Sequence, residues 1–109
     1  GPLHVVRDED GALVGEVGIL NHDEYPEVEL GWTLFDGFEG FGYAAEAAHA
    51  LRAWAFEEHK FPSLVSYIDG ENAASIAVAK RLGAVEDPEA QKTDPDDVVY
   101  RHAGRGRLQ

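Results

Sequence analysis

The sequence predicts a single α/β domain in which a mixed, mostly antiparallel sheet carries two helices. Three observations favour this fold class. Residues 27–35 alternate apolar and polar side chains, which is typical of a strand with one buried face. Residues 42–59 then show helical periodicity, and residues 63–68 form an apolar run that suits a buried strand. A strand, a helix and a strand in this order form a right-handed crossover between parallel neighbours.

Local signals place the other elements along the chain. Asp10-Gly11 is a tight-turn pair between two apolar runs, so it predicts a hairpin of antiparallel strands. Asn72 is a helix N-cap and Gly83 a helix stop, so they bound a second helix. In chain order we expect strands at 3–7, 12–20 and 27–35, a helix at 42–59, a strand at 63–68, a helix at 73–82, and strands at 84–86 and 98–102.

Charge and composition limit the partners of this 109-residue chain. Asp and Glu number 21 against 9 Lys and Arg, which gives a formal net charge of −12. Such a charge argues against nucleic acid and anionic membranes, because phosphates bind Lys and Arg. It suits a cationic partner such as an amine, and it equally suits simple solubility or a cell with high internal salt. The chain lacks cysteine, a membrane-length apolar run and a signal-peptide pattern, so we expect a cytoplasmic protein without disulfides.

Three glycines, at positions 37, 40 and 42, stand where the strand gives way to the first helix. The first turn of a helix has N–H groups without partners and carries partial positive charge. Gly40 and Gly42 have no side chain to keep a ligand away, and Ala44 and Ala45 add little bulk. The segment therefore predicts a main-chain cradle for an anion such as phosphate. Three glycines alone more often mark a plain turn, and neither the dinucleotide fingerprint nor the phosphate-loop motif is present.

Four segments together resemble a known family. In chain order they are "GALVGEVGIL" (11–20), "EVELGWTLFDGFEGFGYAAEAA" (27–48), "LVSYIDGENAASIAVAKRLGAV" (64–85) and "VVYRHAG" (98–104). They resemble the GNAT superfamily of N-acetyltransferases, and most closely the branch that acetylates the N-termini of ribosomal proteins, alanine included. The resemblance implies an acyl-CoA N-acyltransferase-like fold. It also implies transfer of an acetyl group from acetyl-CoA to a primary amine, either a peptide N-terminus or a small molecule.

The family normally begins with a further strand and two helices, and nothing in residues 1–109 corresponds to them. We therefore expect residues 1–109 to be one domain that represents the C-terminal, coenzyme-binding portion of the family fold. Either this is part of a longer enzyme, or it is a short relative that covers its sheet face by self-association. We expect a dimer or larger homo-oligomer. A non-catalytic module that binds coenzyme A or oligomerises is the alternative function.

The resemblance also assigns residues to the coenzyme. The strand before the glycines would run beside the pantetheine arm, Asn72 would bond its amides, and the backbone of the glycine loop and helix start would hold the pyrophosphate. The residues concerned are Leu30, Trp32, Thr33 and Leu34 on the strand, and Gly40, Phe41, Gly42, Tyr43, Ala44 and Ala45 at the loop and helix start. Glu39 and Phe41 depart from the family, which has Gln, Arg or an aromatic at the first position and Lys or Arg at the second. Both changes weaken the attraction for phosphate.

Two residues are candidates for the chemistry. By resemblance, Glu29 would be the general base, acting through water, and Ser75 would bond the sulfur and return a proton. Glu29 also fits an ordinary exposed strand residue, and Ser75 fits a first-turn partner of the Asn72 cap. Tyr67 is a third possible acid, although a packing role suits it better. We expect no metal, because Glu46 and His49 form one Glu-x-x-His pair where a di-iron bundle needs two.

Overall fold

The structure is a computed structural model of the chain, and it describes residues 3–6, 10–21, 23–35, 37 and 42–103. The described elements are β1 (Leu3–Val6), β2 (Leu13–Leu20), β3 (Glu29–Leu34), α1 (Tyr43–Glu57), β4 (Leu64–Asp69), α2 (Ala73–Arg81), β5 (Val85–Glu86) and β6 (Asp97–His102). The prediction of an α/β domain with a mixed sheet and two helices is confirmed, and the predicted element ends lie within two residues of the observed ones. Neither described helix is long and apolar enough to cross a bilayer.

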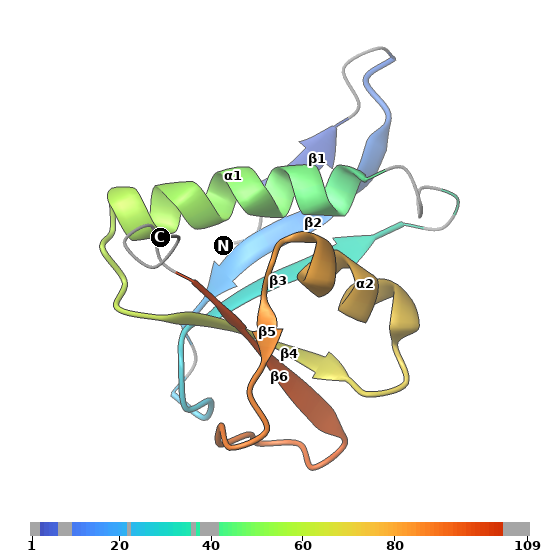
Figure 1. Cartoon of the computed structure of the whole chain (residues 1–109). Coiled ribbons are helices and arrows are strands. Elements are labelled where there is room, and N and C mark those ends of the chain that lie inside the picture. Colours follow the sequence, from blue (N-terminus) through green and yellow to red (C-terminus); the bar gives the residue numbers. More distant parts are fainter. Residues whose placement is uncertain (1–2, 7–9, 22, 36, 38–41, 104–109) are drawn as a thin grey trace.

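Six strands form one sheet in the order β1-β2-β3-β4-β6-β5, with both helices lying against it (Figure 1). Every pair of neighbours is antiparallel except β3 and β4, which are parallel as the crossover through α1 requires. The parallel pair therefore lies in the middle of the sheet. It joins an N-terminal antiparallel half to a C-terminal antiparallel half.

The core lies between the sheet and the two helices. One buried cluster joins β2, β3, α1 and the end of α2 through Val17, Leu30, Ala48 and Leu82. A second joins β4, α2 and β6 through Ile68, Ala79, Ala84 and Tyr100. Trp32 packs against both clusters, so this β3 side chain links the two halves of the core. The alternation of residues 27–35 has the predicted consequence, because Leu30 is fully buried and Thr33 is exposed.

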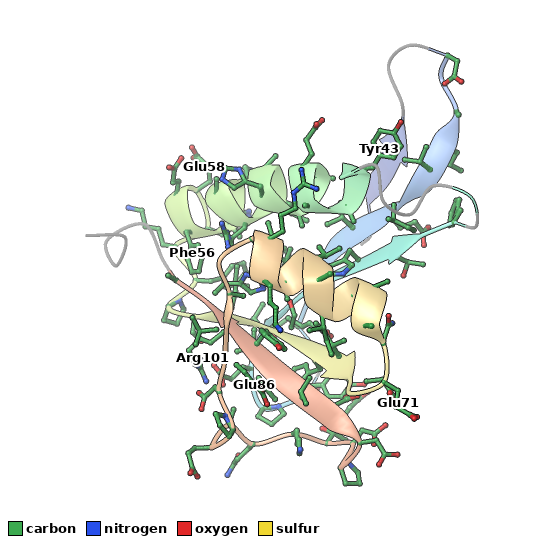
Figure 2. The ribbon with its side chains drawn as sticks, turned by 45° about the vertical axis from the view of Figure 1, so that its right-hand side comes forward. Tyr43, Phe56, Glu58, Glu71, Glu86 and Arg101 are labelled. Atoms are coloured by element: carbon green, nitrogen blue, oxygen red, sulfur yellow. The ribbon has the colours of Figure 1, made fainter. Side chains whose placement is uncertain are left out.

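Two different caps begin the helices. Asn72 caps α2, because its Oδ1 accepts a hydrogen bond from Ser75 N at 3.1 Å. Gly42 precedes α1 in the left-handed region, with φ of 81°, and contributes no side-chain cap. Tyr43 stands at this open end of α1 and Glu58 at the other end (Figure 2). Gly42 therefore adds no side chain at the start of α1.

Candidate coenzyme and acceptor site

The parallel strands β3 and β4 pair at a single register position. Glu29 lies opposite Val65, and Val65 N donates to Val28 O at 3.1 Å. β3 pairs with β2 along its whole length, and β4 pairs with β6 along its whole length. Beyond Glu29 and Val65, β3 and β4 move apart (Figure 1). We call the resulting opening between β3 and β4, beyond Glu29 and Val65, the strand split.

Two side chains occupy the place of the next rung of the ladder. In a continuous parallel ladder, Tyr67 N would donate to Leu30 O. Instead, Tyr67 N donates to Glu29 Oε2 at 3.1 Å, and Leu30 O accepts from Ser66 Oγ at 2.6 Å. Because alternate residues of a strand direct their main-chain groups to the same side, the N–H of Trp32 faces the strand split.

Two neighbouring cavities lie at the strand split. The first, of about 360 Å³, reaches from β2 across β3 to β4, and the second, of about 300 Å³, lies between β3 and the start of α2. Four residues line both cavities: Trp32, Thr33, Asn72 and Ser75. Three carboxylates line the first cavity: Glu16, Glu29 and Asp69. The site therefore combines apolar walls with negative charge.

Most of the predicted site residues lie at these cavities. Glu29, Leu30, Trp32, Thr33, Asn72 and Ser75 line the first, and Leu34 lines the second. The capping interpretation of Asn72 is also confirmed, because its side chain bonds Ser75 N. The structure thus brings residues 29–34 and residues 72–75, far apart in the sequence, to one place. Gly40, Phe41 and the unusual Glu39 lie outside the described residues.

Tyr67, the third possible acid, also lines the first cavity. Its hydroxyl oxygen accepts a hydrogen bond from Glu27 N at 3.1 Å, and its ring stacks on Tyr25 at a centroid distance of 5.3 Å. Burial raises the pKa of its hydroxyl. The residue therefore has clear structural contacts, as the packing interpretation expects.

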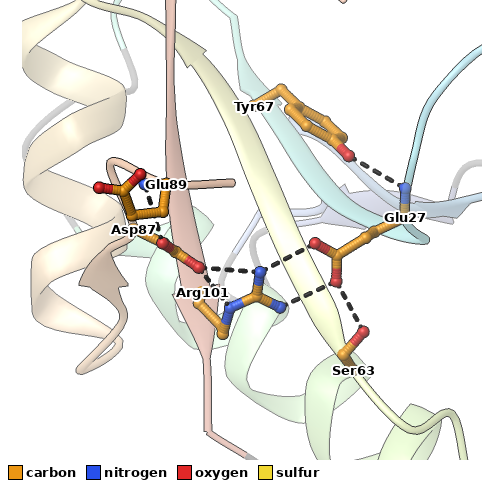
Figure 3. Close-up of polar contacts among 6 residues, drawn as sticks. All are labelled: Glu27, Ser63, Tyr67, Asp87, Glu89 and Arg101. Atoms are coloured by element: carbon orange, nitrogen blue, oxygen red, sulfur yellow. Dashed lines mark hydrogen bonds and ion pairs between the residues drawn. The ribbon is translucent and has the colours of Figure 1, made fainter. Parts of the chain in front are cut away.

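The start of β3 is held by an ion cluster that sequence patterns did not indicate (Figure 3). Arg101 Nη1 and Nη2 each bond one oxygen of Glu27 at 2.8 Å, and Arg101 Nε bonds Asp87 Oδ2 at 3.0 Å. Ser63 Oγ donates to Glu27 Oε1 at 2.8 Å. The bonds to Arg101 lower the pKa of Glu27, so this carboxylate stays charged and ties the entry of β3 to β6.

The N-terminal end of α1 has a cation beside it. A Cβ atom on Gly42 would lie 3.1 to 3.3 Å from the guanidinium of Arg81, which comes from the last turn of α2. Glycine at position 42 therefore allows the cation to approach the main chain. Sequence patterns did not indicate this contact, because the approach of the two helix ends depends on tertiary packing. Arg81 therefore supplies positive charge next to Gly42.

A buried polar network stands behind the strand split. Ser66 and His102 are each only 1% exposed, and Ser66 Oγ lies 2.8 Å from His102 Nε2. Arg52 Nη1 lies 3.3 Å from His102 Nδ1 and donates to Leu82 O at 2.7 Å. Burial, and then the charge of Arg52, lower the pKa of His102 to about 4. The imidazole is therefore neutral at neutral pH.

This network is structural rather than nucleophilic. A serine next to a histidine resembles part of a hydrolase triad, but the third group here is the cation of Arg52, not a carboxylate. The hydroxyl of Ser66 already donates to Leu30 O. Sequence reasoning missed the network, although one signal was present: Ser66 interrupts the apolar run of residues 63–68.

Within the described residues, no group of three or more acidic or histidine side chains is placed to hold a metal.

Residues 2–85 match the family model of the acetyltransferase (GNAT) domain. The chain belongs to this family of acetyltransferases. The predicted family and fold are thereby confirmed.

Two similar proteins support this assignment, and a third shares the fold. An acetyltransferase structure from Agrobacterium tumefaciens C58 is 50% identical with a TM-score of 0.89, over 94% of this chain and 60% of that one. YdaF of Bacillus subtilis, provisionally named a ribosomal N-acetyltransferase, is 31% identical over 75% of this chain and 45% of its own length. Mycobacterium smegmatis RimJ, solved with coenzyme A disulfide, shares the fold at 20% identity and a TM-score of 0.72, over 92% of this chain and 52% of that one. The chain thus spans between about half and three fifths of each relative.

Proposed function

We propose that this chain supplies the coenzyme-binding portion of an N-acetyltransferase that moves an acetyl group from acetyl-CoA to a primary amine. The strand split carries the proposal, because residues of β3, including Glu29, line two neighbouring cavities there together with Asn72 and Ser75. Family membership supports acetyl-CoA as the donor substrate. The identity of the acceptor amine is the finer part of the proposal.

The fit to acetyl-CoA follows from the described residues. The pyrophosphate would lie at the first turn of α1, where the amides and Arg81 attract negative charge. The pantetheine arm would follow β3, with Asn72 near its amides. The N–H of Trp32 faces the strand split and would stabilise the negative charge that grows on the thioester oxygen.

The chemistry requires one nucleophile and two proton transfers. The amine nitrogen attacks the thioester carbonyl carbon, so that a carbon–nitrogen bond forms and the carbon–sulfur bond breaks. Glu29, through a water molecule, takes the proton that the amine loses. Ser75 gives its proton to the leaving sulfur and regains one from solvent. The products are an amide and the free thiol of coenzyme A.

The charge of the first cavity favours a basic acceptor. Glu16, Glu29 and Asp69 line it, and among the described residues no Lys, Arg or His lines it. A protonated amine would be attracted to this cavity before it loses its proton. Both a peptide N-terminus and a small-molecule amine satisfy this requirement.

The first experiment is a thermal-shift titration with acetyl-CoA, followed by a panel of amines assayed by release of free thiol. We expect saturable stabilisation by acetyl-CoA and thiol release with at least one amine. Acetyl-pantetheine, which lacks the nucleotide and pyrophosphate, is the control and should stabilise less. Stabilisation without turnover on any amine would favour the non-catalytic coenzyme-binding module. The absence of any shift would contradict the proposal.

The expected homo-oligomer is a separate part of the proposal. Among the described side chains, Leu13, Trp54 and Val85 are large, apolar and exposed, with 46%, 45% and 69% of their surface accessible. Such residues on a small domain are available for self-association. Light scattering at micromolar concentration should report a dimer or larger species, and a monomer would exclude it.

Replacing Arg81 should weaken coenzyme binding in a salt-dependent way. We expect Arg81→Gln to raise the Kd of coenzyme A roughly fivefold at low ionic strength, as an exposed ion pair worth up to about 1 kcal/mol would. The difference should largely vanish at about 1 M salt, where screening is strong. Lys80→Gln removes the same charge from the neighbouring position and should change the Kd less. Equal effects of the two variants in calorimetric titrations would show that Arg81 has no specific contact.

A further inference from the structure

We propose that Glu29 and Ser66 form a side-chain clamp that keeps β3 and β4 apart, and that His102 and Arg52 are positioning residues that hold Ser66 in the clamping orientation. This inference rests on the proposed function where it concerns coenzyme binding. The clamp itself is a property of the protein without ligand.

The clamp satisfies both ends of a main-chain bond that would otherwise close the strand split. Tyr67 N and Leu30 O are the natural partners for the next rung of the parallel ladder. Tyr67 N donates to Glu29 Oε2 at 3.1 Å instead, and Leu30 O accepts from Ser66 Oγ at 2.6 Å. Both main-chain groups therefore already have partners. A direct hydrogen bond from Tyr67 N to Leu30 O would break these two side-chain bonds and form only one. The open form is therefore favoured before any ligand arrives.

Arg52 contacts His102, and His102 contacts Ser66. The charge of Arg52 therefore determines the direction of the Ser66 hydroxyl hydrogen. Arg52 is always protonated, so it can only donate to His102 Nδ1, at 3.3 Å. A neutral imidazole that accepts at Nδ1 carries its hydrogen on Nε2 and donates it to Ser66 Oγ, at 2.8 Å. The single hydrogen of Ser66 is then left for Leu30 O. Within the described residues, no buried side-chain nitrogen or oxygen lacks a partner, so the network is complete.

The consequence for the site is an open segment of β3. With the ladder stopped after Glu29, the main-chain N–H of Trp32 has no partner in β4 and faces the cavity of about 360 Å³. A pantetheine arm can then use main-chain groups that a closed ladder would occupy. The four clamp and positioning residues come from β3, β4, β6 and α1, so the packing of the whole domain fixes the width of the split.

The matched variants Ser66→Thr and Ser66→Val test the clamp. Both side chains are β-branched and of similar size, and only threonine keeps the hydroxyl. In labelled protein without ligand, scalar couplings across hydrogen bonds identify the acceptor of each amide. In the wild type and in Ser66→Thr, Tyr67 N should couple to the Glu29 side-chain carboxyl carbon and not to the Leu30 carbonyl carbon. In Ser66→Val, Leu30 O loses its side-chain donor, and the coupling to its carbonyl carbon should appear.

Coenzyme binding gives the second readout. We expect Ser66→Val to raise the Kd of coenzyme A roughly tenfold, because a main-chain contact of the arm is lost, and Ser66→Thr to stay close to wild type. A coupling between Tyr67 N and the Leu30 carbonyl carbon in the wild type would overturn the clamp, as would identical couplings in the two variants. This measurement remains decisive if Ser66→Val does not fold. A wild type that shows the clamp couplings but binds no coenzyme A would contradict the proposed function alone.

Discussion

Lowering the pH from 6.5 to 4 should reduce the free energy of unfolding by about 3 kcal/mol through His102 alone. In the folded protein the pKa of this imidazole is lowered to about 4 from its ordinary 6.5, first by burial and then by the charge of Arg52. The unfolded chain therefore binds the proton more readily than the folded chain throughout this interval. The contribution is complete above pH 6.5 and is lost progressively as the pH falls toward 4.

Urea denaturation at a series of pH values measures this effect. The variant His102→Gln lacks the titrating ring, so its stability should depend less steeply on pH between 4 and 6.5, whatever its overall stability. His49→Gln removes an exposed histidine of α1 and should keep the wild-type slope. The raised pKa of Asp97 acts in the opposite direction, but it is common to all three proteins and cancels in the comparison. Parallel curves for wild type and His102→Gln would show that His102 is not buried in its neutral form.

The architecture could be predicted because its signals are local. The alternation of residues 27–35 identified β3. The Asn72 cap and the Gly83 stop marked the two ends of α2. The strand-helix-strand order then required a parallel pair, which the structure has in β3 and β4. The family resemblance also selected residues of 29–34 and 72–75, and these line the two cavities at the strand split.

What sequence reasoning missed depends on pairs of residues that are distant along the chain. Ser66 and His102 are 36 residues apart, and Arg52 and His102 are 50 apart, so no window of sequence contains the network. The contact of Arg81 with Gly42 likewise joins the ends of two helices. Periodicity indicates which face a side chain occupies, but not which polar atom it will meet. Buried polar partners must be satisfied inside the fold, and they become visible only when the fold is known.

The hydrogen bond of Glu29 to Tyr67 N and its proposed role in catalysis can be separated by substitution. Its Oε2 atom accepts the Tyr67 N–H, which belongs to the clamp, while the proposed general base requires an ionised carboxylate. A glutamine at this position can still accept from Tyr67 N through its amide oxygen, but it cannot take a proton from an amine. An alanine loses both abilities. Glu29→Gln therefore tests the proton transfer alone, and Glu29→Ala also removes the hydrogen bond to Tyr67 N.

Glu29→Gln should lower kcat roughly 100-fold, the lower end of the range for loss of general-base catalysis, with little change in the KM for acetyl-CoA. Its pH–rate profile should also lose the part of the acidic limb that the ionisation of Glu29 causes, and keep the part set by deprotonation of the acceptor amine. Glu29→Ala should lower kcat as much and raise the KM as well, since the strand split is no longer clamped on one side. Glu86→Gln makes the same chemical change at an exposed position on β5 and should leave both constants unchanged. If Glu29→Gln keeps full turnover while Glu29→Ala impairs only coenzyme affinity, Glu29 is a clamp residue, and the proton must leave through another group or directly to water.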